Sequence, residues 1–314
     1  MGRMPRWARR ALRAVCLLLV TVSAASAAEV VARPKATPAL WRVQHGTSTV
    51  FLFGSLHVLP RDFSWRTPEI ETAMASADRF VFEVPVDDEA LKDEKDFILQ
   101  NGILTNRQTL RGLLSPSEFQ TYSAILRRAG LKPVFFERYR PWLASVMVGL
   151  AYLHSGDLTT LRGADDDVMT YARDHNRPLL YLENIREQMK LLTTGDDASQ
   201  LKGLKNLILS LPRSRDQEKE LQASWASGDA KGISALLDGY FNGRPDAQDF
   251  LINARNRNWM PAIKESLALG NSTTMMTVGV AHIGGRKGLV ALLCGEGYKV
   301  ERVGTNEDAC GPEA

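Results

Sequence analysis

FLFGSLH, residues 51–57, is an apolar run that stops at Gly54 and leads, two residues later, to His57. The same arrangement recurs near the other end of the chain as MTVGVAH, residues 276–282, with Gly279 and His282. An apolar run that stops at a glycine predicts a buried strand that ends at the rim of a sheet. In open α/β sheets, ligands bind at that rim. We therefore expect the two histidines to meet in one composite site.

Further strands are predicted on both sides of the first motif. Residues 40–44 and 49–53 are separated by a short polar turn and predict a β-hairpin. The apolar run at 79–84 predicts the next strand, and a similar run at 177–183 predicts another. Strand-forming sequence therefore begins well before the middle of the chain.

The stretch between about residues 87 and 270 has a mainly helical pattern, with a capping box and a first-turn proline in SPSE at 115–118. Near the C-terminus, residues 273–279, 285–294 and 298–303 predict a strand, a helix and a second strand. Such a connection normally makes a parallel pair. We predict an α/β fold whose central mixed β-sheet is built from both chain ends and carries a large, mainly helical middle section.

The first 28 residues predict a signal peptide. Five arginines precede a short apolar run at 14–22, and Ala25-Ser26-Ala27 offers a small-x-small cleavage pattern. The alternative is an uncleaved membrane anchor, although the apolar run is too short to span a bilayer. Cleavage would leave residues 29–314 as one α/β domain with a helical insertion at about 87–270. We expect this mature form to be periplasmic or secreted and, having no long apolar run, not to span a membrane.

Removal of the signal peptide changes the charge of the chain. The full sequence has 39 basic and 36 acidic residues, and the five leading arginines account for its net charge of +3. Without them, 34 basic side chains face 36 acidic ones, a formal charge of −2. A nucleic-acid partner suggested by the basic precursor therefore loses its support.

Two cysteines remain after the signal peptide, Cys294 and Cys310. An exported protein meets an oxidising compartment, where a disulfide between them would close a short loop around the last predicted strand. The alternative is two unpaired, inert thiols. Neither cysteine has ligand-like spacing to a histidine motif, which argues against a catalytic thiol or a zinc finger.

Four polar side chains stand at predicted strand ends: His57, Glu83, Glu183 and His282. Imidazole nitrogens and carboxylate oxygens are the usual ligands of Zn²⁺, Mn²⁺ or Co²⁺ where no thiolate takes part. Such an ion can activate water, and a further carboxylate can serve as general base. The structural alternative is that each histidine only forms hydrogen bonds and each glutamate only pairs with a helix. The matched contexts of the two histidines favour function.

Other sequence motifs narrow the choice of enzyme class. The chain has no Gly-x-Ser-x-Gly, no phosphate-binding loop and no dinucleotide fingerprint. Their absence argues against a serine hydrolase of the usual elbow type, a phosphate-loop nucleotidase and a Rossmann dehydrogenase.

At these residues the chain resembles the TraB/PrgY/GumN family, whose animal relatives include the TIKI proteases. The resemblance extends over roughly residues 40–303, with specific ends and a weak centre between 89 and 156. Its motifs are GSLHVLP at 54–60, ADRFVFE at 77–83, GAD at 163–165, PLLYLE at 178–183 with Gln188, Arg255-Asn256 with Trp259, and VGVAH at 278–282 with the glycines and leucines that follow.

The resemblance implies an α/β core with helical additions, like that of the erythromycin esterases and ChaN, and a metal-dependent hydrolase that is proteolytic in the TIKI branch. It also implies roles for particular side chains. The catalytic candidates are His57, Glu83, His282 and Arg255, of which His57, His282 and Glu83 are also the candidate metal ligands. The substrate-binding candidates are Gly54, Gly279, Asp165, Glu183 and Asn256.

Three hypotheses for function follow. The first is an exported hydrolase that cleaves a peptide or another small amide by water activated on a divalent ion, Mn, Co or Zn. The second is a binding protein of the same fold that holds a ligand or a metal without turnover. The third is a metal-free, esterase-like hydrolase with His57 and Glu83 as acid–base groups.

Overall fold

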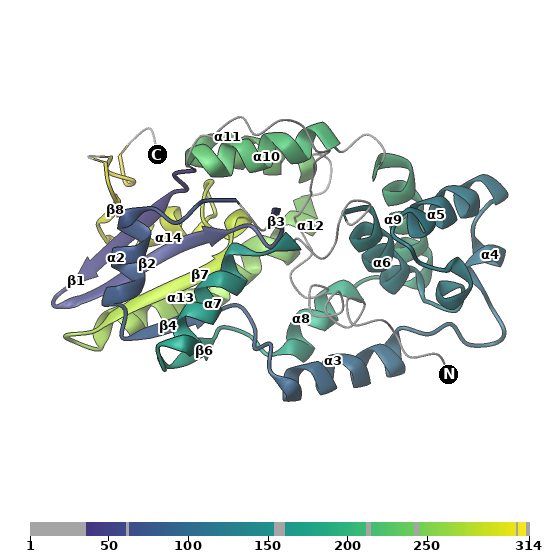
Figure 1. The fold of residues 1–314 in the computed structure, drawn as a ribbon, viewed down its shortest axis with the longest axis horizontal. Coiled ribbons are helices and arrows are strands. Elements are labelled where there is room, and N and C mark those ends of the chain that lie inside the picture. Colours follow the sequence, from purple (N-terminus) through teal and green to yellow (C-terminus); the bar gives the residue numbers. More distant parts are fainter. Residues whose placement is uncertain are drawn as a thin grey trace. The chain divides into compact units, whose positions relative to one another are not determined.

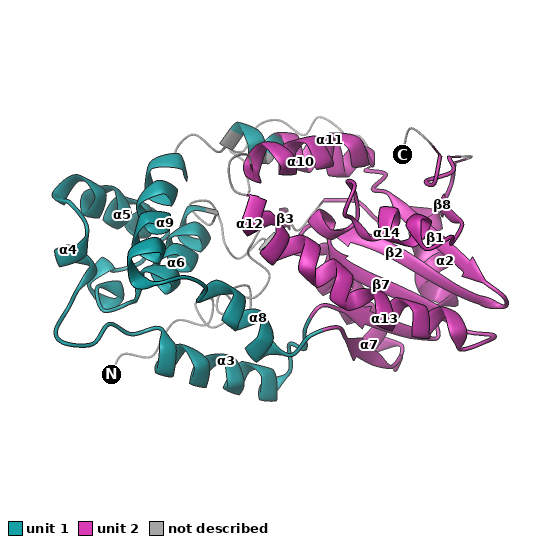
Figure 2. Ribbon diagram, turned by 180° about the vertical axis from the view of Figure 1, so that it is seen from behind, with its two compact units in different colours: residues 1–27, 84–161, 183–219 teal, residues 28–83, 162–182, 220–314 magenta. Residues whose placement is uncertain are grey.

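The computed structural model describes residues 36–60, 63–153, 161–211, 215–241, 245–305 and 307–311. The predicted signal peptide and His154 lie outside them. The described chain divides into two compact units (Figure 2). We call them the helical unit (Val84–Leu161 and Glu183–Lys219) and the sheet unit (Ala28–Glu83, Arg162–Leu182 and Glu220–Ala314). The stretch expected as one helical insertion, about 87–270, is thus shared between the units.

Six strands of the sheet unit form one mixed sheet in the order β6-β4-β7-β2-β1-β8 (Figure 1). The strands are β1 (Leu40–His45), β2 (Ser48–Ser55), β4 (Arg79–Phe82), β6 (Leu179–Tyr181), β7 (Thr273–Gly279) and β8 (Val300–Arg302). Strand β7 from the C-terminal part lies parallel between β2 and β4 from the N-terminal part. The predicted α/β fold with a sheet built from both chain ends is confirmed.

The sequence-based prediction for the last two strands needs a correction. Strands β7 and β8 run in the same direction but are not neighbours, because β2 and β1 lie between them. Strand β8 pairs antiparallel with the hairpin strand β1 at the edge of the sheet. The intervening helix α14 covers only Leu289–Gly295, and the preceding glycine-rich residues form a turn.

Helices cover both faces of the sheet. Helices α13 (Ala254–Ala268) and α14 pack on one face, where Trp259, Ile263 and Leu293 join a core with Leu52 and Met276 of the strands. Helices α2 (Pro68–Ser76) and α7 (Ala164–Asp174) pack against the other face. The sheet is therefore the middle of three layers, and its central strands are buried.

Short elements complete the sheet unit. They are α11 (Ala230–Phe241), α12 (Pro245–Gln248), the π-helix η5 (Asp249–Asn253) and the 3₁₀ helix η6 (Val280–His282). Strands β3 (Leu59–Pro60) and β5 (Leu161–Arg162) form a separate two-stranded sheet. The boundary between the units falls within α10 (Arg215–Ser227).

The helical unit has its own hydrophobic core, in which Tyr122, Leu126 and Leu143 are almost completely buried. The predicted capping box is present at its α5, where Ser115 and Glu118 each accept the other's backbone N–H. The helices of this unit are α3 (Asp88–Asn101), α4 (Leu110–Leu113), α5 (Pro116–Arg128), η2 (Pro133–Phe136), α6 (Pro141–Leu153), α8 (Ile185–Leu192) and α9 (Asp197–Ser210). No helix among the residues described is both long and apolar enough to cross a membrane.

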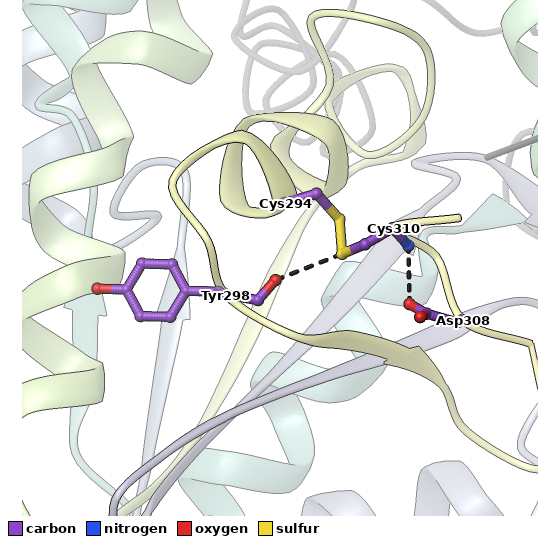
Figure 3. The surroundings of a disulfide bond; sticks show 4 residues. All are labelled: Cys294, Tyr298, Asp308 and Cys310. Atoms are coloured by element: carbon purple, nitrogen blue, oxygen red, sulfur yellow. Dashed lines mark hydrogen bonds between the residues drawn. A yellow bond between two sulfur atoms is a disulfide. The ribbon is translucent and has the colours of Figure 1, made fainter. Parts of the chain in front are cut away.

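A disulfide joins Cys294, in α14, to Cys310 (Figure 3). Cys310 Sγ lies 3.3 Å from the carbonyl oxygen of Tyr298, and the Cys310 amide donates to the side chain of Asp308. The bond thereby ties the segment after β8 to the helix before it. The predicted pairing is confirmed.

Candidate functional site

Both Gly-x-x-His motifs lie at the carboxyl ends of neighbouring parallel strands. In the register of β2 and β7, Gly54 faces Val278 and Ser55 faces Gly279, so the two histidines follow side by side. On the other side of β7, strand β4 ends at Phe82, and Glu83 comes next. His57, Glu83 and His282 therefore all follow strand ends at the same edge of the sheet.

Gly279 is the point at which these side chains converge. A methyl group added to it would lie 3.2 Å from His57 Nε2, 3.3 Å from Glu83 Oε1 and 3.8 Å from His282 Cδ2. The backbone of Gly279 has an ordinary negative φ, so close approach rather than left-handed geometry requires glycine here. The expectation that both imidazoles meet beside an acidic side chain agrees with this geometry.

Glu83 is buried and accepts a hydrogen bond on each oxygen. The backbone N–H of Gly279 donates to Oε1 at 2.7 Å, and Arg255 donates through Nη2 to Oε2 at 2.6 Å. Burial alone would raise the pKa of Glu83, but Arg255, the two histidines and the Gly279 amide lower it to about 2. Glu83 is therefore an anion at neutral pH, and both of its oxygens are engaged.

His282 is fixed in one tautomer by Asn256. The Asn256 amide nitrogen donates to the carbonyl oxygens of His282 and Lys287, so its Oδ1 is turned to His282 Nδ1, 2.7 Å away. Since an amide oxygen only accepts, Nδ1 carries the proton, and Nε2 accepts from Arg255 Nη1 at 3.0 Å. Burial, with help from Arg255 and His57 and against Glu83, lowers the pKa of His282 to about 3.

Arg255 is held by helix α13 and by the π-helix that precedes it. Its guanidinium carbon lies 4.7 Å from the ring centre of Trp259, one turn later on the same helix, and Trp259 also contacts the His282 ring. Nη1 donates to the carbonyl oxygen of Leu251, within η5. Its side chain is only 6 % exposed. The guanidinium therefore occupies a defined position between Glu83 and His282.

His57 has a carboxylate on the side away from the cluster. Its Nδ1 lies 3.1 Å from Asp165 Oδ1, at ion-pair distance but without the angle of a hydrogen bond. Gly163 makes this approach possible, since a methyl group there would come within 2.9 Å of the His57 carbonyl oxygen and collide with Asp165. Burial would lower the pKa of His57, but Asp165, Glu83 and Asp166 together raise it. Among the residues that the structure describes, His57 Nε2 has no hydrogen-bond partner.

Two of the predicted site residues have other surroundings. Gly54 accepts a hydrogen bond from Trp225 Nε1 through its carbonyl oxygen and packs tightly against Val280 and Ile283, so it supports the rim from behind. Glu183 is partly exposed and belongs to the helical unit, whereas the cluster around Gly279 is built from the sheet unit alone. The contribution that sequence analysis missed is the Leu251 carbonyl, because a backbone acceptor in a π-helix leaves no side-chain signal.

His57, Glu83 and His282 do not form the metal-ligand set predicted from the sequence. In the described part of the chain, no three His, Cys, Asp or Glu side chains are grouped as ligands of an ion. The physical reason is Arg255, whose guanidinium takes the single lone pair of His282 Nε2, bonds Glu83 Oε2 and places a positive charge between them. As arranged around Arg255, these residues do not fit a divalent ion.

The model of the TraB/PrgY/gumN family matches residues 39–302, most of the chain. The chain belongs to this family. The match confirms the resemblance seen in the motifs, and its range includes His57, Glu83, Arg255 and His282. No curated protein and no solved structure matches the chain.

Proposed function

We propose that this TraB-family chain is a hydrolase that cleaves a peptide, or a related small amide or ester, with a water molecule activated by His57. The observation that carries the proposal is the position of His57 Nε2. It faces Gly279, Glu83 and His282 without a hydrogen-bond partner among the described residues, while Asp165 stands behind Nδ1.

The neighbouring groups are poorer bases than His57. Both oxygens of Glu83 already accept hydrogen bonds, and its pKa of about 2 makes it a weak proton acceptor at neutral pH. His282 Nε2 accepts from Arg255, and the pKa of His282 is about 3. The pKa of His57 is instead raised by Asp165, Glu83 and Asp166 against the effect of burial, and its Nε2 has no hydrogen-bond partner among the described residues.

In the proposed reaction, one proton passes from water to His57 and then to the leaving group. His57 Nε2 takes a proton from water as the water oxygen bonds to the substrate carbonyl carbon. Asp165 stabilises the imidazolium that forms, in the role that an acid behind a catalytic histidine commonly has. The tetrahedral intermediate then expels its amine or alcohol, which receives the proton from His57. Arg255 supplies positive charge beside the cluster in which negative charge develops.

The test is turnover by the purified mature chain on a peptide library and on chromogenic esters, with and without chelator. His57→Ala should lose turnover, and chelator should leave the wild-type rate unchanged. His175→Ala is the matched control, because His175 is an exposed histidine at the end of α7. Its hydrogen bonds to described residues stay within its own helix, and its ring stacks on Tyr171. Equal melting curves for both variants exclude unfolding as the cause.

Two results would reject this function. Full turnover in His57→Ala would remove His57 as the base. No turnover of any substrate, together with saturable binding of a peptide, would establish the rival binding protein instead.

We also propose that the chain is exported, as its first 28 residues predict. The Cys294–Cys310 disulfide supports export, because such bonds persist in oxidising compartments. Fractionation of producing cells, followed by N-terminal sequencing, should find a chain that starts at Ala28 or Glu29 outside the cytoplasm. A full-length chain retained in the cytoplasm would reject the proposal.

A further inference from the structure

We propose that Arg255 is the resident cation of this site, and that its guanidinium fills a cation position which a divalent ion can take only when Arg255 is removed. The inference rests on the proposed function in that both concern the same site. The contacts of Arg255 that support it do not depend on whether the chain is a hydrolase. The inference names what occupies the place in which the sequence predicted Mn, Co or Zn.

The guanidinium of Arg255 is surrounded by three acceptor atoms. Arg255 donates to a carboxylate oxygen of Glu83 at 2.6 Å, to the imidazole Nε2 of His282 at 3.0 Å and to the carbonyl oxygen of Leu251 at 3.3 Å. Carboxylate, imidazole and carbonyl groups are also the atoms that bind divalent ions. The guanidinium is thus ligated much as a metal would be, with one negative charge against its own positive charge.

The acceptor side chains are already oriented for a cation by their other hydrogen bonds. Asn256 holds His282 with its proton on Nδ1, which directs the Nε2 lone pair toward Arg255. The same tautomer, with Nδ1–H bonded to an outer acceptor, is the one used by histidines that bind metals through Nε2. The Gly279 amide likewise fixes Glu83 from the other side. These supports come from the backbone and from a neutral amide, so they remain in place when Arg255 is replaced.

Arg255 leaves no room for a second cation beside Glu83 and His282. Its side chain is 6 % exposed and lies over the face of Trp259. An ion entering beside it would meet a fixed positive charge at short range, with both acceptors already engaged. Repulsion between like charges is strong in a site shielded from water. Binding of an ion to the wild-type chain is therefore unfavourable while Arg255 stays in place.

The test uses the purified mature chain and the variant Arg255→Ala, with Arg257→Ala as the matched control. Arg257 lies two residues further along α13, is exposed and pairs with Asp249, so its removal deletes the same charge outside the site. Metal content is measured by elemental analysis, and binding by calorimetry and by the shift in melting temperature with added Zn²⁺ or Mn²⁺. Neither readout uses turnover, so the inference can fail while the hydrolase proposal stands, and the reverse.

We expect no stoichiometric ion in the wild type or in Arg257→Ala, and no rise in their melting temperatures with either metal. Arg255→Ala should bind one equivalent and gain several degrees in melting temperature. One equivalent of metal in the wild-type chain, lost in His282→Ala, would overturn the inference. So would a folded Arg255→Ala that binds no ion. If the alanine variant does not fold, Arg255→Met takes its place, because it fills the volume and still frees both acceptors.

Discussion

Replacing Glu83 by glutamine should destabilise the protein far more than an ordinary loss of one charge. Glu83 is 5 % exposed and accepts hydrogen bonds from Arg255 and Gly279. Its pKa falls from 4.5 to about 2 on folding, which corresponds to about 3 kcal/mol at 1.36 kcal/mol per unit. Removing one partner of a buried ion pair costs about 3–5 kcal/mol, because the other charge stays buried and uncompensated. The two estimates agree.

The assay is denaturant unfolding of the wild type and of Glu83→Gln at neutral pH, with the free energy extrapolated to water. The matched control is Glu301→Gln. The pKa of Glu301 is also lowered to about 2, mainly by hydrogen bonds from Arg42 and Lys299. Its side chain is 30 % exposed, however, so water screens the interaction and its loss should have little effect. If both glutamine variants lose the same free energy, the buried pair does not stabilise the sheet unit as we reason.

The same interaction sets the direction of the pH dependence. The folded-state pKa of Glu83 is depressed, so its contribution is complete above pH 4.5 and is lost as the pH falls toward about 2. His282 also has a depressed pKa, so the unfolded chain binds its proton first and stability falls between pH 6.5 and about 3. Wild-type stability should therefore decline on acidification from pH 6.5. Glu83→Gln should make the decline below pH 4.5 shallower by the share that Glu83 contributes, and an unchanged profile would contradict the assignment.

Three further predictions follow from the same site and from the disulfide. Asn256→Ala should cost about 2–4 kcal/mol in denaturant unfolding, because two buried groups lose their partners, whereas Asn258→Ala, exposed on the same helix, should cost little. The rate constant kcat/KM should rise with pH as His57 loses its proton above pH 6.5, and Asp165→Asn should move the midpoint down; an unmoved midpoint would exclude Asp165 as its partner. Replacing both cysteines of the disulfide by serine should cost about 3 kcal/mol by loop entropy, and an unchanged free energy of unfolding would show that the bond is dispensable.

Local sequence signals predicted much of the sheet unit. Strand β2 ends at Ser55 and β7 at Gly279, within one residue of where their apolar runs stop, and the predicted capping box is present at Ser115 and Glu118. These features depend on residues within one turn or one strand, so the sequence carries them directly. The position of β8 in the sheet cannot be predicted from local sequence in this way. Strand β8 pairs with β1 because β1 offers a free edge of the sheet. The local sequence of β8 does not reveal which edge it will join.

The candidate site divides in the same way. The positions of His57, Glu83 and His282 follow from strand ends, and two parallel pairings bring those ends together. Which group satisfies Glu83 does not follow, since Arg255 comes from a helix 172 positions away in sequence. The sequence pattern of carboxylate and imidazole side chains at strand ends is the same for a metal site and for a site whose cation is an arginine side chain. The sequence could therefore name the acceptors but not the cation that they hold.

The two Gly-x-x-His motifs look equivalent in sequence but have different tasks in the structure. A side chain at Gly54 would come within 3.0 Å of Val280 and Ile283, so the first motif's glycine lets the second motif's segment pack against it. A side chain at Gly279 would instead enter the space shared by His57 and Glu83. One glycine brings the motifs together, and the other keeps the space between their side chains open. Two copies of one pattern thus build a single site, because each glycine faces the other motif.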